Sequence, residues 1–561
     1  MKILLVAINA KYIHSNLAVY SLKAYSREYS TNVEIANFTI NNREEQIIKD
    51  IYKSGADVIA FSTYIWNVDM VHLIATELKK VMPNVHIWLG GPEVSYDALN
   101  VLESHNYLDG IMMGEGEATF YELAKHYVDG AIEFSDIAGI AYRSENGVLA
   151  NSMRPLMNMD DIPFVYSDLQ EFDNRIIYYE SSRGCPYSCS YCLSSIDKNV
   201  RFRSLELVKK ELQFFLDNKV KQVKFVDRTF NCKREHTMGI WQYILENDNG
   251  VTNFHFEIAA NLLNDEELCL ISKMRPGLIQ LEIGVQSTNE KTIECIDRKI
   301  EFEQIKRVVT KVNSFGNIHQ HLDLIAGLPY EDYESFKNSF NDVYALEPEQ
   351  LQLGFLKVLK GSNMQMRAKE YELVYKDRAP YEVMSTKWLD FSKMLCLKNV
   401  EEMLETYYNS GQYRYTVKFL EKSFATPYDM YFALSEYYEK NGLYDVKHSR
   451  ISRYTHLYEF AKSVDATNEQ VYAKLLTYDL YLREKLKTRP AFAIDQVEHK
   501  QTIRELYDTV FADYKNKMTH LELVDIDVTT GKNIEPRWYL FDYTVRNPLN
   551  DDAKVIICEK M

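Results

Sequence analysis

Short apolar runs alternate with amphipathic stretches through the first third of the chain. Strand-like apolar runs begin at residues 2, 33, 57, 86 and 110, and stretches of helical periodicity follow at 17–27, 44–52, 71–82, 98–103 and 118–127. A strand followed by a helix, repeated five times, predicts parallel βαβ units in a doubly wound sheet. We therefore expect an α/β chain that begins with a Rossmann-like domain over residues 1–145.

The ends of these predicted strands are rich in glycine and polar residues. Parallel sheets bind ligands at the carboxyl ends of their strands, and glycine lets the backbone approach a ligand closely. Neither glycine cluster fits GxGxxG, so a dinucleotide is not favoured; a scaffold that binds nothing is the alternative. The candidate binding residues are Asn9, Ser62, Thr63, Tyr64, Gly90, Gly91, Pro92, Glu93, Gly114, Glu115, Gly116 and Glu117.

A second alternation of strands and helices covers residues 201–364. Strand-like runs lie at 222–230, 253–261, 278–287, 318–329 and 351–362. They predict a partial (β/α) barrel over 176–375, joined to the first domain by a linker at 146–175. Period-2 alternation puts polar residues on the inner face of four strands, which suits a polar cavity better than a dry core. The inward sets are Asp227 with Phe225, Glu257 with His255, Gln286 with Gly284 and Glu282, and Asp323 with His321 and His319.

Residues 376–561 carry no strong motif. The pattern predicts mainly helices to about residue 515 and strands at the end. Tyrosines are frequent here, and we expect them to serve helix packing more than a substrate pocket. The region is expected to be a substrate or cover domain.

Composition narrows the functional classes. The chain has 561 residues and a formal net charge of −16, which argues against a nucleic-acid partner. No stretch reaches the ~20 apolar residues of a membrane span. The opening run MKILLVAINAKYIHSN reads as a first buried strand and not as a signal peptide. We expect a cytoplasmic protein.

Three of the eight cysteines are clustered. Cys185, Cys189 and Cys192 are spaced x3 and x2, and no cysteine precedes them. Three local thiolates can hold an iron–sulfur cubane and leave one iron without a protein ligand. A structural zinc site requires four ligands, and no histidine lies nearby. The spacing therefore favours a [4Fe–4S] cluster over zinc or a closed electron-transfer site.

This spacing, with Tyr191 before the third cysteine, resembles the radical S-adenosylmethionine (SAM) enzymes. The runs LEIGVQSTNEKTIECIDRK and HLDLIAGLPYEDYESF resemble the branch that includes the anaerobic coproporphyrinogen dehydrogenase. The resemblance implies that SAM chelates the open iron, that Gln286 and Asp323 hold its ribose and that Arg298 holds its carboxylate. FVDRTFN replaces the usual Gly-Gly-Glu motif, so Asp227 and Asn231 are the candidates for the SAM amino group.

The loops LGGPEVS and MMGEGEATFYEL resemble those of cobalamin-binding domains fused to radical SAM enzymes. The usual Asp-x-His-x-x-Gly loop is missing. His14 lies in the right loop, but Tyr12 and Leu17 replace its Asp and Gly, so we expect a surface or hydrogen-bonded histidine there. The resemblance implies cobalamin whose lower face has no protein ligand; a domain that has lost cobalamin is the alternative.

Together these resemblances imply a cobalamin-dependent radical SAM methyltransferase acting on a small molecule or peptide. An external flavodoxin- or ferredoxin-like donor would supply electrons. The alternatives are a cyclase or oxidase like the anaerobic magnesium-protoporphyrin ester cyclase, and a non-enzymatic cobalamin or redox sensor. A tRNA methylthiotransferase would need three cysteines before Cys185, and the chain has none there.

Overall fold

The N-terminal sheet has seven strands in the order β2-β1-β3-β4-β5-β6-β7, of which the first five run parallel. A computed structural model describes residues 1–196 and 198–558. Strands β6 and β7 add an antiparallel hairpin that ends at Ala150, past the domain boundary we placed at residue 145. The bounds are β1 Ile3–Asn9, β2 Val33–Thr39, β3 Val58–Ser62, β4 His86–Gly90, β5 Gly110–Met112, β6 Ile140–Ser144 and β7 Gly147–Ala150.

Helices cover both faces of this sheet. Alternate residues of β1 enter different cores: Ile3 and Leu5 pack with α1 and α6, whereas Leu4 and Val6 pack with α2, α3 and α5. A strand buried on both faces is typical of a doubly wound sheet, so the predicted fold is confirmed. The bounds are α1 Leu17–Tyr25, α2 Glu44–Ser54, α3 Val68–Val81, α4 Pro92–Ser95, α5 Ala98–Ser104 and α6 Glu117–Asp129.

The central sheet is a six-stranded parallel partial barrel in the order β15-β14-β13-β12-β11-β8. Its first strand, β8, was not predicted because three residues are too short for a periodic signal. The strands are β8 Ile177–Tyr179, β11 Gln222–Phe225, β12 Asn253–Ile258, β13 Ile279–Gln286, β14 His319–Ala326 and β15 Gln350–Phe355. The helices are α7 Leu205–Asp217, α8 Arg234–Glu246, α9 Asp265–Ile271, α10 Glu290–Cys295, α11 Phe302–Asn313, α12 Tyr333–Tyr344 and α13 Asn363–Met366.

The C-terminal region is mainly helical and ends in a three-stranded antiparallel sheet, as predicted. Its buried tyrosines pack between helices: Tyr407, Tyr431 and Tyr454 are at most 1% exposed. The elements are β16 Val374–Tyr375, β17 Val383–Ser385, α14 Phe391–Leu404, α15 Arg414–Leu420, α16 Pro427–Lys440, α17 Arg450–Val464, α18 Glu469–Arg483, α19 Lys500–Asp508, β18 Thr519–Ile526, β19 Asn533–Arg546 and β20 Ala553–Ile557.

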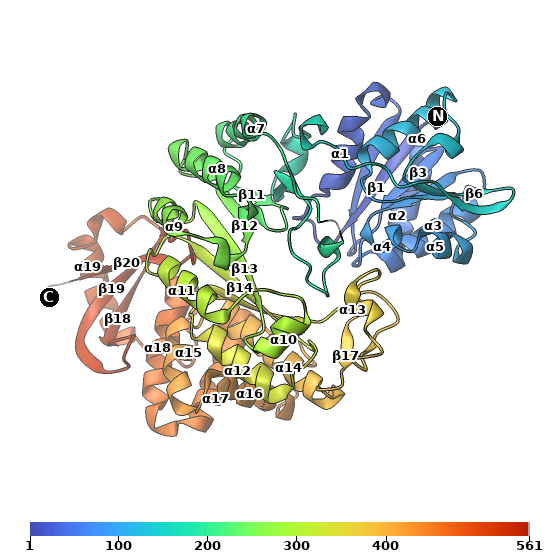
Figure 1. The fold of residues 1–561 in the computed structure, drawn as a ribbon. Coiled ribbons are helices and arrows are strands. Elements are labelled where there is room, and N and C mark those ends of the chain that lie inside the picture. The colour runs from blue at the N-terminus through green and yellow to red at the C-terminus, as the bar shows by residue number, and fades with distance from the viewer. Residues whose placement is uncertain (197, 559–561) are drawn as a thin grey trace.

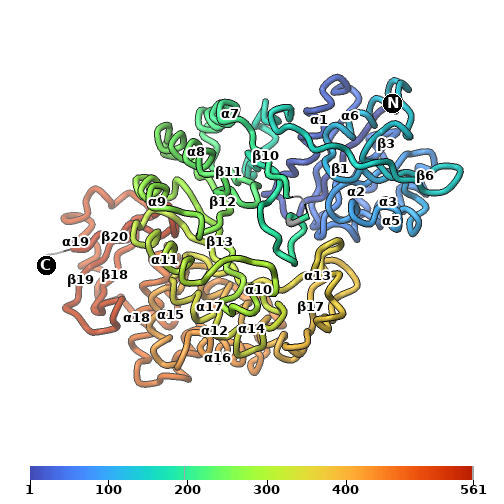
Figure 2. Tube along the Cα trace, viewed as in Figure 1, coloured from blue at the N-terminus to red at the C-terminus, as the bar shows by residue number. Residues whose placement is uncertain are grey.

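The barrel lies between the N-terminal domain and the C-terminal region (Figure 1; Figure 2). The segment around α13 and β17 returns to the N-terminal domain, where Lys360 pairs with Glu93 at 3.1 Å. At the opposite end of the barrel, His319 Nδ1 lies 3.4 Å from the carbonyl oxygen of Leu549. Among the described residues, no helix has the length and apolar character needed to span a membrane.

Candidate active site

The cysteine loop, residues 185–192, follows strand β9 (Ser182–Arg183), which pairs with β10 (Arg201–Phe202). Gly184 begins the turn at φ +99°, a conformation that favours glycine. Both backbone groups of Ser190 are anchored: its N–H donates to Ile296 at 3.0 Å, and its carbonyl accepts from Met364 at 2.8 Å. The loop is therefore held between the end of α10 and the start of α13.

The three thiols of this loop are free and lie within electrostatic range of one another. Burial raises the pKa of Cys189, and the charges of Cys185 and Cys192 add to that rise. Three neighbouring thiols suit a metal cluster, because bound iron would stabilise their thiolates. Cys232 interacts with Cys185 alone of the three. The residues present therefore fit a cubane with three protein ligands.

Arg298 joins the cysteine loop to strand β13. Its guanidinium donates to Tyr191 Oη at 2.9 Å and to the carbonyl of Gly284 at 2.5 Å, and it lies 3.8 Å from Cys189 Sγ. Its Nε is buried and has no hydrogen-bond partner among the described residues. The predicted carboxylate-binding arginine is therefore beside the predicted cluster, with one donor unused.

Gly284 is the point where the predicted SAM residues meet. A Cβ on this residue would overlap Gln286 Nε2 and lie 3.2 Å from Arg298 Nη2. Asp323 is its register partner on β14, and the register shifts between Gly284 and Gln286. Gln286 adopts φ +73°, and its buried Oε1 accepts no hydrogen bond from the part of the chain that the structure describes. The structure thus brings Gln286, Arg298 and Asp323 together.

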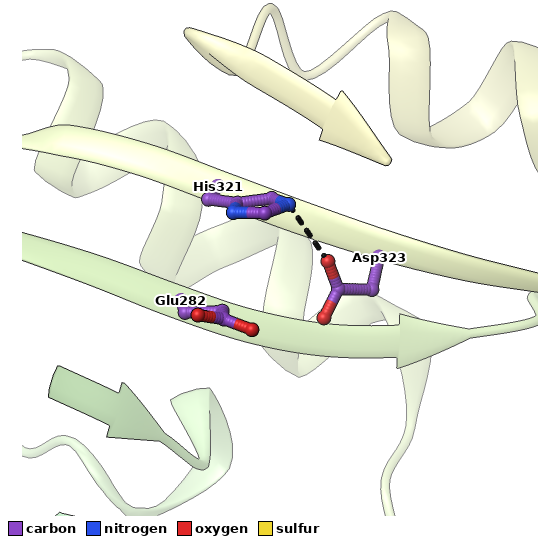
Figure 3. Close-up of side chains that lie close together, drawn as sticks. All are labelled: Glu282, His321 and Asp323. Carbon is purple, nitrogen blue, oxygen red and sulfur yellow. Dashed lines mark ion pairs between the residues drawn. The ribbon is translucent and has the colours of Figure 1, made fainter. Parts of the chain in front are cut away.

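An ion network lines the barrel interior below this point. Glu282 Oε2 accepts from Lys224 Nζ at 3.0 Å and from His255 Nε2 at 2.9 Å. Burial would raise the pKa of Glu282, but these two partners lower it to about 2. His321 Nε2 lies 3.0 Å from Asp323 Oδ1 (Figure 3). These contacts confirm the inward faces predicted for β13 and β14.

Glu282, His321 and Asp323 have ligand atoms within 4.8 Å of one another, a spacing that could hold a metal ion. The ammonium group of Lys224, however, already balances the Glu282 carboxylate. A cation beside that ammonium would be repelled. We therefore interpret the group as an ion network and not as a metal centre.

Glu257 faces the same interior as the register partner of Glu282. Burial, with repulsion from Glu282, raises the pKa of Glu257 to about 7. Within the described part of the chain its side chain makes no hydrogen bond or ion pair. It is therefore an acid available to a ligand.

The face predicted for β11 is wrong by one residue. Lys224 points into the barrel, whereas the ring of Phe225 packs against Phe256 at a centroid distance of 4.5 Å, under the helices. The strand has only four residues, so the alternation could not be extended reliably to its end.

Asp227, predicted to contact SAM, is fully buried. Its carboxylate accepts from the N–H of Ser181 at 2.9 Å, from Ser181 Oγ at 2.7 Å and from Ser182 Oγ at 2.5 Å. Burial raises the pKa of Asp227 to about 7. Its carboxylate therefore fixes the start of the cysteine loop.

The small residues predicted to bind cobalamin gather at one edge of the first sheet. Asn9, Ser62 and Gly90 end β1, β3 and β4, and Ser62 pairs with Gly90 in register. Gly91 adopts φ +117°, and a Cβ there would overlap the carbonyl oxygen of Thr63. Only glycine permits this close approach, so Gly91 lets the loop after β4 pack directly on the backbone that follows β3.

Two aromatic features flank this edge. The rings of Tyr64 and Trp66 stack at 4.4 Å with an interplanar angle of 6°. His14 Nδ1 lies 2.7 Å from Tyr178 Oη, and burial lowers the pKa of His14. His14 is thus a hydrogen-bonded loop histidine.

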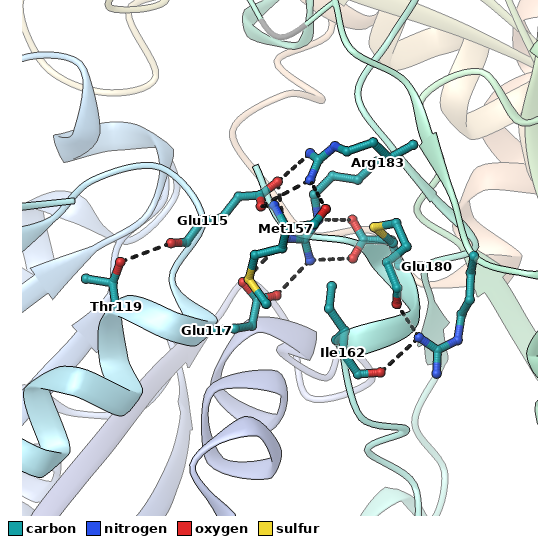
Figure 4. A network of polar contacts seen from close by, with 10 residues as sticks. Glu115, Glu117, Thr119, Met157, Ile162, Glu180 and Arg183 are labelled. Carbon is teal, nitrogen blue, oxygen red and sulfur yellow. Dashed lines mark hydrogen bonds and ion pairs between the residues drawn. The ribbon is translucent and has the colours of Figure 1, made fainter. Parts of the chain in front are cut away.

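The three acidic residues of the predicted cobalamin loops point toward the barrel. Glu93 accepts from Tyr381 and pairs with Lys360. Glu117 pairs with Arg183 at 2.7 Å, and Glu115 accepts from the N–H of Met157 at 3.0 Å (Figure 4). Their side chains therefore join the two domains.

Arg183 and Arg201, one on each side of the cysteine loop, complete this contact. Arg183 pairs with Glu117 and Glu180, each at 2.7 Å, and Arg201 pairs with Glu115. We missed both arginines in the sequence. The sequence did carry a signal for this contact, because basic residues flank the cysteines and the loop MMGEGE is acidic. Opposite charges on the two segments could have indicated that they pair.

Three family models match the chain. Residues 3–124 match the B12 binding domain, residues 179–343 match the radical SAM superfamily, and residues 369–541 match a protein of unknown function, DUF4080.

Similar proteins point the same way. The chain is 27% identical over 313 residues to the cobalamin-dependent radical SAM methyltransferase TokK of Streptomyces tokunonensis, covering 51% of this chain and 44% of TokK. It is 22% identical over 330 residues to the anaerobic magnesium-protoporphyrin IX monomethyl ester cyclase of Rubrivivax gelatinosus, covering 56% and 58%. The chain thus spans about half the length of these relatives.

A solved structure supports the fold. The cobalamin-dependent SAM radical enzyme OxsB, with aqua-cobalamin and SAM bound, superposes with a TM-score of 0.59 and 17% identity over 92% of this chain and 80% of OxsB. The consecutive B12-binding and radical SAM matches agree with the two parallel sheets and the cysteine loop. Residues 3–124 are therefore a B12 binding domain and residues 179–343 a radical SAM domain, and the cofactors of these two domains are cobalamin, SAM and a [4Fe–4S] cluster.

Proposed function

We propose that this chain is a cobalamin-dependent radical SAM methyltransferase that methylates an unactivated carbon of a small molecule or peptide. The observation that carries the proposal is the position of Arg298. This one side chain contacts Tyr191 of the cysteine loop and Gly284 of the strand that ends in Gln286. A guanidinium there can grip a carboxylate beside the cluster, as SAM requires.

The residues around the cluster bind and orient SAM. When bound, the cluster supplies the electron that splits SAM into methionine and a radical able to remove hydrogen from carbon. Cys185, Cys189 and Cys192 would hold the cluster, and Asp227 fixes the backbone at the start of their loop. Arg298 holds the SAM carboxylate. Gln286 and Asp323 hold the ribose through their amide and carboxylate oxygens.

In this proposal the B12-binding domain positions cobalamin beside the barrel. Cobalamin, when bound, carries the methyl group between SAM and substrate. Asn9, Ser62 and Gly90 at the ends of β1, β3 and β4 form the edge on which cobalamin would lie, and His14 is hydrogen-bonded to Tyr178. We therefore propose that no histidine ligates the cobalt from below.

A reducing compartment and an electron donor complete the proposal. Three free thiols persist in a chain that is kept reduced, which favours the cytoplasm. The cluster would receive its electron from a small flavodoxin- or ferredoxin-like protein.

Cyclisation or oxidation is the second candidate, favoured by the likeness to the anaerobic cyclase. A sensor has no need of the Gln286, Arg298 and Asp323 set.

Anaerobic enzyme loaded with cobalamin is incubated with methyl-labelled SAM, a reductant and candidate substrates, and products are analysed by mass spectrometry. Labelled methyl in a product supports methyl transfer. 5′-Deoxyadenosine with an unlabelled, altered product contradicts it and favours the cyclase-like reaction.

A further inference from the structure

Among the residues that the structure describes, one cation between the N-terminal domain and the barrel makes no hydrogen bond or ion pair. Arg183, Arg201 and Lys360 each pair with a glutamate of the N-terminal domain. Arg228 follows strand β11 of the barrel, lies within electrostatic range of Tyr64 in the N-terminal domain, and is exposed. Over residues 1–196 and 198–558, its guanidinium makes no hydrogen bond or ion pair. Among the described residues, Arg228 therefore forms no ion pair, although Glu257 lies within its electrostatic range.

The backbone that carries Arg228 is fixed on both sides. Asp227 accepts three hydrogen bonds from Ser181 and Ser182, which begin the cysteine loop. Thr229 Oγ1 lies 3.6 Å from Cys185 Sγ. The residues on either side of Arg228 therefore face the cluster region, and Arg228 extends from a rigid turn.

The charge of Arg228 reaches both domains. Burial raises the pKa of Tyr64 and of Glu257, and the positive charge of Arg228 opposes that rise in each. Tyr64 lies at the cobalamin edge of the first sheet, and Glu257 lies inside the barrel. Because Arg228 lies within electrostatic range of both Tyr64 and Glu257, we place it between the edge proposed for cobalamin and the region proposed for SAM.

We propose that Arg228 binds an anionic oxygen group, a carboxylate or phosphate of the substrate, in the space between the cobalamin edge and the barrel. The assignment rests on the proposed function and gives its substrate class. A planar guanidinium binds such groups through paired N–H donors, and the rigid turn reduces the ordering cost. Bound there, the anion would orient the substrate between the methyl carrier and the radical source.

The same chemistry could come from the phosphodiester of cobalamin itself. That group sits on the nucleotide loop of the cofactor, and cobinamide lacks it. Comparison of hydroxocobalamin with cobinamide therefore separates the cofactor from the substrate as the source of the anion.

The test uses anaerobic enzyme carrying its cluster, cobalamin and SAM, with inorganic phosphate as the probe in equilibrium dialysis. Arg228→Gln removes the charge, and Arg228→Lys retains it. Arg307→Gln on α11 is the matched control, because Arg307 is also exposed and lies on the outer helix of the barrel. We expect Arg228→Gln to weaken phosphate binding by about tenfold or more, Arg228→Lys by about threefold, and Arg307→Gln not at all.

Equal phosphate affinity in Arg228→Gln and wild type would overturn the proposal. A loss of affinity for hydroxocobalamin but not for cobinamide in Arg228→Gln would also overturn it, because the anion would then belong to the cofactor. If wild type binds phosphate through Arg228 but does not cleave SAM, the proposed function fails while the anion subsite stands.

Discussion

A glycine on β13 gives the SAM residues room to converge. Gly284 faces the barrel interior, and the side chains of Gln286 and Arg298 occupy the space that a Cβ would take. The carbonyl of Gly284 also accepts from Arg298. The lack of a side chain is therefore part of the proposed binding site.

We predict that Gly284→Ala weakens SAM binding by about tenfold or more, because the new methyl displaces Gln286 and Arg298 together. Gly354→Ala on β15 is the matched control, since its methyl would meet the carbonyl oxygen of Leu324 at 3.3 Å, a contact that a small shift relieves. Dissociation constants for SAM, measured anaerobically on both variants, check the prediction. Equal affinities would show that the residues do not converge on SAM.

Residues that belong to a local sequence motif could be proposed as site residues from the sequence. The cysteines were identified from their spacing, whereas Gln286, Arg298 and Asp323 were proposed from the resemblance to radical SAM enzymes; the structure places Arg298 beside Cys189 and Gly284. Arg183 and Lys224 were not identified, because their partners lie 66 and 58 residues away in sequence. Ion pairs between distant strands leave no local pattern.

At the scale of elements, the end of β13 is held by a buried acid. Glu331 is 1% exposed and accepts from Ser287 Oγ at 2.6 Å and from Ser339 Oγ at 2.9 Å. Ser287 directly follows Gln286, which has φ +73°. Glu331 thus stabilises the strained strand end that presents Gln286.

We predict that the buried carboxyl group of Glu331 makes the free energy of unfolding depend on pH. Burial raises the pKa of Glu331 to about 7, whereas the unfolded chain releases this proton near pH 4.3. Because the folded state retains the proton, the free energy of unfolding falls as pH rises from about 4.5 to about 7, by up to about 3 kcal/mol. Glu331→Gln should remove this part of the slope. Urea unfolding midpoints between pH 5 and pH 8 measure it.

Glu334→Gln, at an exposed position on α12, is the control and should keep the wild-type slope. Parallel pH profiles for wild type and Glu331→Gln would mean that the acid is ionised in the folded protein.

Long periodic elements were predictable and short ones were not. Strands β13 and β14 have eight residues each, and alternation gave their inward faces correctly. Strands β8 and β11 have three and four residues, so one was missed and the other was assigned the wrong face. Alternation over so few residues cannot fix which side faces the core.

For the whole molecule, the two cofactor regions are joined by ion pairs. Glu115 and Glu117 follow β5 of the N-terminal domain, and Arg183 and Arg201 flank the cysteine loop. The linker joins the same contact, since the carbonyl of Met157 accepts from Arg201 at 2.8 Å. These contacts hold the proposed cobalamin edge and the cluster in one geometry.

We predict that Glu117→Gln loosens the domain contact, because Arg183 loses a buried charged partner. The expected cost of about 1–2 kcal/mol corresponds to about fivefold to thirtyfold faster cleavage of the 146–175 linker by a protease. Glu77→Gln, which removes an exposed pair with Lys80, is the control and should leave the rate unchanged. Equal cleavage rates in the two variants would show that this pair does not hold the domains together.

The proposed reaction requires that SAM binds the iron that the three cysteines leave without a protein ligand. Electron–nuclear double resonance of the reduced cluster, with SAM carrying ¹⁵N in its amino group, measures this directly. We predict a ¹⁵N coupling in wild type, and no cluster signal in Cys189→Ala, whereas the exposed Cys269→Ala should behave as wild type. A reduced cluster without any ¹⁵N coupling in the presence of SAM, or zinc in place of iron, would contradict the account.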